Sequence, residues 1–233
     1  MPQSESDTKV PACIGIIMDG NRRWARSRGL PAVLGHKHGA DKLKEVLGWT
    51  KSRRIRHLIV YAFSTENWNR SKEEVDYLTE TIHRFFGKQS ADLKKIRAEG
   101  CRLRFVGERA RFAPDIQDVL SSAEKETEHG AYTLWVGLSY GGRAEILHAV
   151  EALQKSGEPV TEESFAKHLW TSGMPDPDIV IRTSGEERLS GFLPWQGVYS
   201  ELFFTDTLWP DFSESEFDTI LAEYAARERR HGK

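Results

Sequence analysis

The chain has 233 residues, with 33 Lys and Arg against 35 Asp and Glu, and therefore a formal net charge of −2. This near-neutral balance argues against nucleic-acid binding, which requires a strongly basic surface. Hydrophobic residues make up 39% of the chain, which is enough for a globular core, and the length suits one α/β domain.

The ends of the chain and its cysteines add little chemistry. Residues 1–11 are polar and contain two prolines, so we expect a flexible N-terminal segment before the folded domain. The longest apolar runs have about six residues, against the ~18 that span a bilayer, and the N-terminus lacks the apolar region of a signal peptide. These features predict a cytoplasmic protein. Cys13 and Cys101 are far apart, which suits two reduced core thiols.

Apolar runs alternate with segments of helical periodicity along the rest of the chain. Strands are predicted over 12–18, 57–63, 101–106, 132–138, 178–183 and 201–205. Helices are predicted over 36–53, over one long segment from Lys72 to Ile96, over 114–128, and after the capping box that Ser213 forms with Glu216. This alternation predicts a single-domain α/β fold with a mainly parallel six-stranded sheet and helices on both faces.

Arginine and glycine gather where the predicted strands end. The strand-exit segments are 19–24, 64–70, 107–109, 139–143 and 182–190; each contains Arg and four contain Gly. Ligands of parallel sheets bind beyond the carboxyl ends of the strands, and Arg offers a planar fork to phosphate oxygens. Five such segments therefore favour a polyanionic phosphate ligand. The alternative is that these arginines pair with surface carboxylates.

One pattern points to a different chemistry. Residues 137–141 read GLSYG and match the GxSxG nucleophile elbow of serine hydrolases, between a predicted strand and a predicted helix. Ser139 would be the nucleophile, and the histidines that follow it are His148, His168 and His231. A serine hydrolase therefore stays as an alternative. The chain lacks the Walker A, GxGxxG and HExxH motifs.

An acidic residue at the first strand exit suggests a metal. Asp19 is followed at once by Gly20 and, after one residue, by two arginines. Mg²⁺ prefers one or two carboxylates together with substrate phosphates, which the arginines would hold. Glu201, which opens the last predicted strand, is the candidate second carboxylate.

Several long motifs in order resemble the cis-prenyltransferases of the undecaprenyl diphosphate synthase family. They are IIMDGNRRWA at 16–25, GHKHG at 35–39, YAFSTENWNR at 61–70, YGGR at 140–143, IRTSGEERLSGFLPWQ at 181–196 and ELFFTDTLWPDF at 201–212. The resemblance covers residues 12–231 and implies one catalytic domain over 12–233. It also implies Mg²⁺-dependent condensation of isopentenyl diphosphate with an allylic diphosphate such as farnesyl diphosphate, an apolar tunnel for the growing chain, and a homodimer.

The resemblance also assigns roles to residues. Asp19 matches the catalytic, Mg²⁺-binding aspartate, Asn67 the proton acceptor of a mobile loop, and Glu201 the second metal carboxylate. The remaining residues match the substrate-binding positions of the family: Gly20, Asn21, Arg22, Arg23, Trp24, His36, Ser64, Thr65, Glu66, Trp68, Arg70, Arg182, Arg188, Leu189 and Ser190. Of these, Arg182, Arg188 and Ser190 belong to the isopentenyl diphosphate site.

Three positions depart from the family pattern. Ala32 stands where an arginine often binds the allylic diphosphate, so this contact is either missing or supplied by Arg26 or Arg28. Ser139 replaces the usual Asn and thereby creates the GxSxG match, and Glu187 replaces a basic residue.

The product length, a membrane contact and a possible partner chain are further expectations. The small Ala62 is typical of members with an open tunnel, which predicts a long product of C50 to C55, such as the undecaprenyl diphosphate of a lipid carrier. Basic stretches at 51–57 and 227–230 could contact a membrane surface. Since some relatives only activate another chain, a noncatalytic partner subunit is the remaining alternative.

Overall fold

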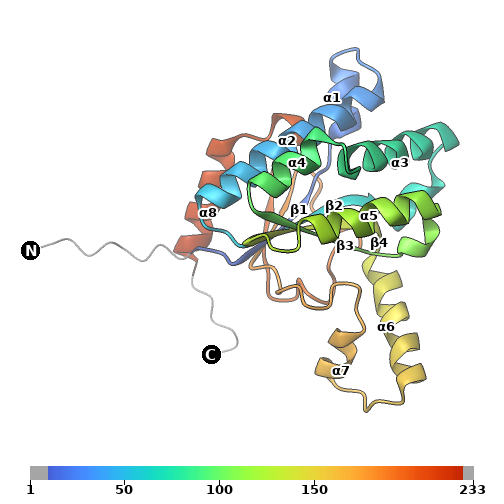
Figure 1. Ribbon diagram of the computed structural model, residues 1–233. Helices are drawn as coiled ribbons and strands as arrows, with labels where there is room; N and C mark the ends of the chain where they lie inside the picture. Colours follow the sequence, from blue (N-terminus) through green and yellow to red (C-terminus); the bar gives the residue numbers. More distant parts are fainter. Residues whose placement is uncertain (1–9, 228–233) are drawn as a thin grey trace, which may run out of the picture.

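Six parallel strands form the central sheet of the protein, in a computed structural model that describes residues 10–227 (Figure 1). Their spatial order is β3-β4-β2-β1-β5-β6, and every pairing is parallel. The strands are β1 (Cys13–Ile17), β2 (His57–Ser64), β3 (Cys101–Val106), β4 (Tyr132–Tyr140), β5 (Ile179–Arg182) and β6 (Glu201–Phe204). The predicted six-stranded parallel sheet is confirmed. Most of the predicted lead-in, 1–9, lies outside the described residues, and Pro11 at its end is buried.

Helices connect the strands. They are α1 (Asn21–Ser27), α2 (Ala32–Ser52), α3 (Lys72–Phe86), α4 (Ala91–Ala98), α5 (Pro114–Glu126), α6 (Gly142–Ser156), α7 (Glu162–Lys167) and α8 (Glu214–Ala226). Single 3-10 turns follow β2, β3 and β6: η1 (Thr65–Asn69), η2 (Arg109–Arg111) and η3 (Trp209–Asp211). None of the helices within residues 10–227 is long and apolar enough to cross a bilayer.

The single long helix expected from Lys72 to Ile96 is wrong, because the chain breaks between α3 and α4. Gly87 is extended, with φ −62° and ψ 148°, which ends α3. Ser90 then begins α4, and its hydroxyl accepts hydrogen bonds from the backbone N–H groups of Asp92 and Leu93. The apolar periodicity continues across the break because both helices pack on one core.

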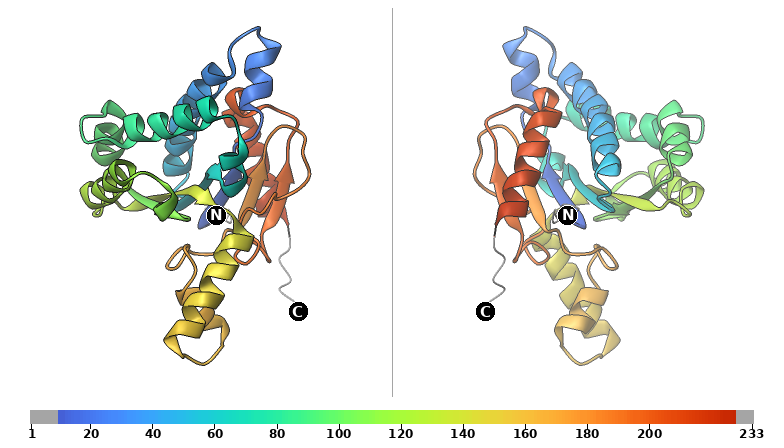
Figure 2. Two further views of the ribbon diagram at one scale, coloured as in Figure 1. Left: turned by 90° about the vertical axis from the view of Figure 1, so that its right-hand side faces the viewer. Right: turned by 90° about the vertical axis from the view of Figure 1, so that its left-hand side faces the viewer.

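The two faces of the sheet are covered differently. Along β1, Ile14 and Ile16 face the large core that α2, α3, α4, α5 and α8 cover. Cys13 and Ile17 face a smaller core, which includes Tyr140 and residues from the irregular chain between α7 and β6. Helices α6 and α7 pack on each other and project from this second side (Figure 2). Helices therefore flank both sides, but irregular chain covers much of the second face.

A β-bulge lies near the end of β2, beside the candidate active site described below. Tyr61 pairs with Gly137 and Phe63 with Leu138, so β2 has one extra residue, Ala62. In a regular strand, residues 61 and 63 would share a face. The bulge instead leaves Tyr61 on the smaller core and Phe63 on the larger one, while Ala62 is exposed. A small exposed side chain thus lies at the exit of a central strand.

Candidate active site

The carboxyl ends of β1, β2 and β5 open into a pocket of about 500 Å³. Chain segments distant in sequence meet there because parallel strands end at the same edge of the sheet. The pocket brings together most of the predicted catalytic and binding residues, which we call the cradle: Asp19, Gly20, Asn21, Arg22, Arg23, His36, Ser64, Asn67, Arg70, Arg182 and Ser190. Six further residues at the pocket lay outside the predicted set of catalytic and binding residues: Ile17, Met18, Arg26, Tyr61, Ala62 and Leu78. Among the two candidate replacements for the arginine missing at Ala32, Arg26 lines the pocket, whereas Arg28 pairs with Asp211.

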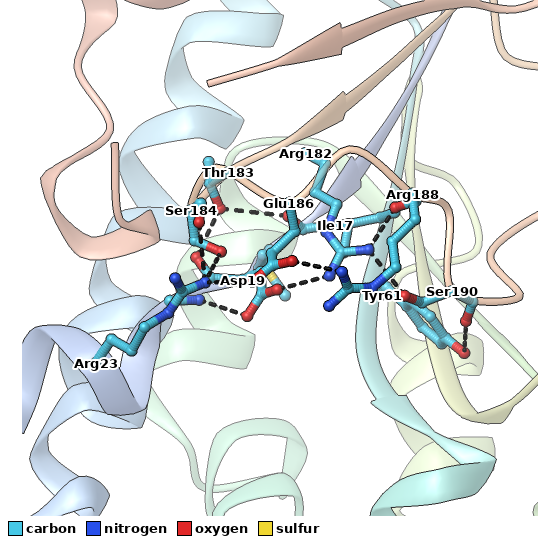
Figure 3. Close-up of polar contacts among 12 residues, drawn as sticks. Ile17, Asp19, Arg23, Tyr61, Arg182, Thr183, Ser184, Glu186, Arg188 and Ser190 are labelled. Carbon is cyan, nitrogen blue, oxygen red and sulfur yellow. Dashed lines mark hydrogen bonds and ion pairs between the residues drawn. The ribbon is translucent and has the colours of Figure 1, made fainter. Parts of the chain in front are cut away.

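Asp19 and Arg182 form the ion pair at the centre of this pocket (Figure 3). Arg182 Nη2 lies 2.8 Å from Asp19 Oδ2, and the Gly20 N–H donates to Asp19 Oδ1 at 2.7 Å. Burial alone would raise the pKa of Asp19, but the hydrogen bonds and charge of Arg182 and the Gly20 N–H outweigh it and lower that pKa. Asp19 is therefore a carboxylate at neutral pH, with its side chain 36% exposed toward solvent.

The segment after β5 is held together by the same guanidinium. Arg182 Nη1 donates to Ser190 Oγ at 2.8 Å and to the carbonyl oxygen of Arg188. The Arg182 side chain is only 5% exposed, and its buried Nε lacks a hydrogen-bond partner. Arg182 thus fixes the Arg188–Ser190 segment relative to Asp19.

Arg23 reaches the segment after β5 from α1. Its Nη2 donates to the carbonyl oxygen of Ser184 at 2.9 Å, and it lies 3.6 Å from Glu186 Oε1. Glu186 also pairs with Arg188. We did not predict Glu186 as a site residue, although its place in the β5 exit segment was a usable signal. Glu187, the departure noted in the sequence, is exposed.

A second residue missed by the sequence analysis, Glu74, joins three basic groups of the cradle. Its carboxylate lies 2.6 Å from Arg70 Nη1, 3.6 Å from Arg22 Nη1 and 3.8 Å from His36 Nε2. Burial lowers the pKa of His36, and the charge of Arg70 lowers it further. His36 is therefore mainly neutral at pH 7, and Glu74 balances two arginines. The sequence signal for Glu74 was its place in the first turn of a helix: Ser71, three residues earlier, caps α3 and accepts a hydrogen bond from the Glu74 N–H.

The 3-10 turn η1 presents Asn67 to the pocket. Asn67 Oδ1 accepts the Ser64 N–H at 3.1 Å, and the Ser64 side chain caps the turn in return. This reciprocal cap fixes the loop locally. Thr65 and Glu66 point into an adjoining pocket of about 520 Å³, which Gly141, Gly142 and Arg143 also line.

Four other predicted binding residues do not line the main pocket. Trp24 is buried, and its Nε1 donates to Asp211 Oδ1 at 2.7 Å. Trp68 packs on Phe63 behind the loop. Leu189 packs against the smaller core, and the Arg188 side chain points to Glu186 at the rim. Trp24, Trp68 and Leu189 therefore support the pocket rather than line it.

Glu201 lies at the opposite end of the sheet from Asp19. It pairs in register with Ile179, at the start of β5, whereas Arg182 at the end of β5 contacts Asp19. Three residues of a strand separate the two levels, a rise of about 10 Å. Glu201 instead forms an ion pair with Arg227, 2.6 Å away. The expected pair of metal carboxylates is thus not assembled within one chain.

The chemistry of the pocket suits Mg²⁺ bound through Asp19. Within residues 10–227, no group of three or more His, Cys, Asp or Glu side chains converges as a metal site. One ionised carboxylate beside several arginines is nevertheless the arrangement in which Mg²⁺ takes its remaining ligands from substrate phosphates and water.

An apolar cavity of about 120 Å³ lies beneath α3, next to the polar pocket. Met18, Ala62 and Leu78 line both spaces, so the two adjoin. The cavity is lined further in by Leu43, Ile82, Phe85, Phe86, Val136 and Leu138. This cavity lies where the expected apolar tunnel would begin, next to the charged pocket.

Ser139 does not have the setting of a hydrolase nucleophile. Its side chain is buried, and Ser139 Oγ accepts a hydrogen bond from Trp68 Nε1 at 2.9 Å. His148 contacts Trp170, and His168 lies 3.4 Å from Glu158. His231 lies outside the described residues. A buried and hydrogen-bonded serine cannot present the exposed hydroxyl that a nucleophile elbow requires.

Comparisons with known proteins agree with this geometry. The sequence model of the prenyltransferase family, described as "Putative undecaprenyl diphosphate synthase", matches residues 17–232. The isoprenyl transferase of Lactococcus lactis is 42% identical and aligns with 100% of this chain and 97% of its own length. That of Aquifex pyrophilus is 43% identical, with 97% of both chains covered.

Solved structures share the fold. Lavandulyl diphosphate synthase from Lavandula x intermedia, crystallised with dimethylallyl diphosphate, has a TM-score of 0.89 and 33% identity over 96% of this chain and 99% of that chain. A probable undecaprenyl diphosphate synthase from Campylobacter jejuni has a TM-score of 0.82 and 30% identity over 97% and 100%.

The fold and the site define a prenyl-transferring enzyme. This chain belongs to the undecaprenyl diphosphate synthase family and is a cis-prenyltransferase, which elongates prenyl chains.

Proposed function

We propose that the enzyme condenses isopentenyl diphosphate with an allylic diphosphate, in the first instance farnesyl diphosphate, in a Mg²⁺-dependent reaction. The observation that carries this proposal is the junction of two unlike spaces, the pocket around Asp19 and the apolar cavity below Ala62. A diphosphate head suits the first space and a prenyl tail the second. The dimethylallyl diphosphate named with the lavandulyl diphosphate synthase structure is also an allylic diphosphate.

In this proposal the allylic diphosphate binds between Asp19 and the basic groups of the cradle. Asp19 would hold Mg²⁺, which supplies positive charge to the phosphate oxygens. Arg22, Arg23 and Arg70 stabilise the negative charge that grows as the C1–O bond of the allylic substrate breaks. Each such stabilising group is typically worth about 10²–10³ in rate.

Isopentenyl diphosphate would bind at the β5 exit, through Arg182, Arg188 and Ser190. Its double bond then attacks the allylic C1, so that a new C–C bond forms and a proton leaves C2 of the isopentenyl unit. Asn67 is the proposed proton acceptor, because it lines the pocket and one lone pair of its Oδ1 is not used by the Ser64 N–H.

The proposed product is long, C50 to C55, which suits a lipid carrier such as undecaprenyl diphosphate. Small Ala62 leaves the cavity entrance open. The cavity itself, about 120 Å³, is smaller than the ~300 Å³ of ordinary ligand pockets. A long chain therefore requires α3, which carries Phe85 and Phe86, to move away from the sheet.

A homodimer is also part of the proposal. The edge strand β6 exposes Leu202 and Phe204, and the preceding loop exposes Val198 and Tyr199. Exposed apolar residues that gather on one sheet edge are typical of protein–protein interfaces and uncommon on the surfaces of monomers. A cytoplasmic enzyme that touches the membrane through its lipid product remains a prediction, and 228–230 of the basic C-terminal stretch lie outside the described residues.

The test is product analysis with purified protein, ¹⁴C-isopentenyl diphosphate, farnesyl diphosphate and Mg²⁺. We expect butanol-extractable polyprenyl diphosphate of C50 to C55, with each new double bond cis, that disappears with EDTA or in Asp19→Ala. Asp41→Ala, an exposed control on α2, should retain activity. Lack of product from the homogeneous wild-type protein, with activity only after a second chain is added, would instead identify a noncatalytic partner subunit.

A further inference from the structure

Ser139 has a backbone conformation that side chains rarely adopt. Its φ is +49°, in the left-handed region, although it lies near the end of β4 and is buried. Non-glycine residues with such φ values are uncommon and are often held in place for a function. The hydrolase interpretation does not explain this one, because the Ser139 hydroxyl is buried.

The partner of the Ser139 hydroxyl is the indole of Trp68. Trp68 Nε1 donates to Ser139 Oγ at 2.9 Å. The indole is packed against Phe63 and Phe112, with ring centroids 4.9 and 5.2 Å apart, and Arg111 Cζ lies 5.0 Å from the Trp68 ring. Trp68 is thereby held on three sides by rings and a cation and at its one polar atom by Ser139.

The two residues after Ser139 contact the same loop. Tyr140 pairs with Ser64 in the sheet. A Cβ on Gly141 would lie 2.4 Å from Thr65 Oγ1, so only glycine lets Thr65 come this close. The end of β4 therefore contacts the loop at its first, second and fifth residues, 64, 65 and 68. Asn67, which lines the reaction pocket, lies between these contacts.

We infer that Ser139 is a positioning residue, whose hydrogen bond to Trp68 holds η1 so that Asn67 faces the substrates. The inference rests on the proposed function for its effect on catalysis. Ser139 does not line the reaction pocket and acts only through Trp68. The left-handed backbone at 139, where the β2–β4 register also shifts, directs the hydroxyl to the indole.

This role predicts which side chains position 139 accepts. Ala would keep the strained backbone and leave the partly buried indole N–H without an acceptor. Asn tolerates the left-handed region far better than other side chains and carries an amide oxygen that can accept the same hydrogen bond. Ser139→Asn should therefore preserve the anchor, whereas Ser139→Ala should break it.

The experiment compares Ser139→Ala, Ser139→Asn, Trp68→Phe and the double variant of Ser139→Ala with Trp68→Phe. We expect Ser139→Ala to lower kcat about ten- to a hundredfold, with KM for both diphosphates changed less than twofold, because misplaced catalytic groups slow the chemical step. Trp68→Phe also removes the hydrogen bond, so the double variant should lose little more activity than either single variant. Ser139→Asn should keep wild-type kcat.

A second readout does not depend on activity. In protein labelled with 5-fluorotryptophan, the ¹⁹F signal that Trp68→Phe removes belongs to Trp68. That signal should shift or broaden in Ser139→Ala and stay near its wild-type position in Ser139→Asn. An unchanged signal in Ser139→Ala, or losses of the two single variants that multiply in the double variant, would overturn the inference. If the wild-type protein shows no prenyl transfer, the proposed function fails, while the ¹⁹F shifts still decide whether Ser139 anchors Trp68.

Discussion

Replacing Arg182 by Ala should damage both stability and catalysis, and the two effects can be separated. Arg182 is nearly fully buried and donates to Asp19, to Ser190 and to the Arg188 carbonyl. Its loss leaves the Asp19 carboxylate without its cation in a half-buried position. It also releases the segment that carries the proposed isopentenyl diphosphate site.

The expected size follows from burial. Breaking a fully buried ion pair by removing one partner costs about 3–5 kcal/mol. Because the Asp19 side chain is 36% exposed, water compensates part of this, and we expect about 2–3 kcal/mol. For a domain of this length, that corresponds to a fall in Tm of roughly 5–10 °C. Because Arg182 holds both Asp19 and the proposed isopentenyl diphosphate site in place, its loss should misplace these groups and lower kcat about 10²-fold.

Asp19→Asn is the variant that separates the effects. The double variant of Arg182→Ala with Asp19→Asn lacks the uncompensated charge, so it should recover much of the Tm that Arg182→Ala loses. It should regain none of the activity, because both groups serve the reaction. Calorimetry and the labelled isopentenyl diphosphate assay give the two quantities. A wild-type Tm in Arg182→Ala, or a double variant less stable than that single variant, would refute the reasoning.

Three further predictions concern the pocket. Ala62→Leu should narrow the cavity entrance and shift the product to shorter chains at similar initial rates, as chromatography of the dephosphorylated products can show; an unchanged C50 to C55 product would contradict it. Glu74→Gln should raise KM for the allylic diphosphate about tenfold, since Arg22 and Arg70 lose their shared anion, whereas Asp76→Asn on the exposed side of α3 should not; equal KM values would contradict this role. Because burial and Arg70 keep the pKa of His36 below its ordinary value, the unfolded chain binds a proton that the folded chain does not as pH falls through about 6.5. Stability should therefore drop between pH 7.5 and 5.5, and over this range the urea midpoint should fall less in His36→Asn than in the wild-type protein. An equal fall of the urea midpoint in both proteins would exclude this contribution.

The sheet was predictable because buried parallel strands are continuous apolar runs between loops. LIVYAF and DIVI mark β2 and β5 for this reason, and the ends of all six strands agree with the predictions to within about two residues. The break between α3 and α4 was not predicted, since the apolar pattern is the same on both sides of Gly87. Only the turn residues between the two helices, Gly87 to Ser90, carried that information.

The sequence indicated which strand exits form the site, but not on which side of the chain each site residue lies. Asp19, Arg182 and Asn67 meet because parallel strands end at one edge. Glu201 opens a strand instead of following one, so parallel order itself places it at the far edge. Trp68 belongs to the same loop as Asn67, yet sequence does not say which side of a 3-10 turn a residue occupies.

The position of the metal ion tests the account most directly. Crystals soaked with Mn²⁺ and a non-hydrolysable farnesyl thiodiphosphate would locate the ion by its anomalous signal. We predict one Mn²⁺ bound to an Asp19 oxygen and to the diphosphate, with the farnesyl chain running past Ala62 under α3. An ion bound elsewhere, with Asp19 still paired only to Arg182 and the lipid outside the cavity, would contradict it.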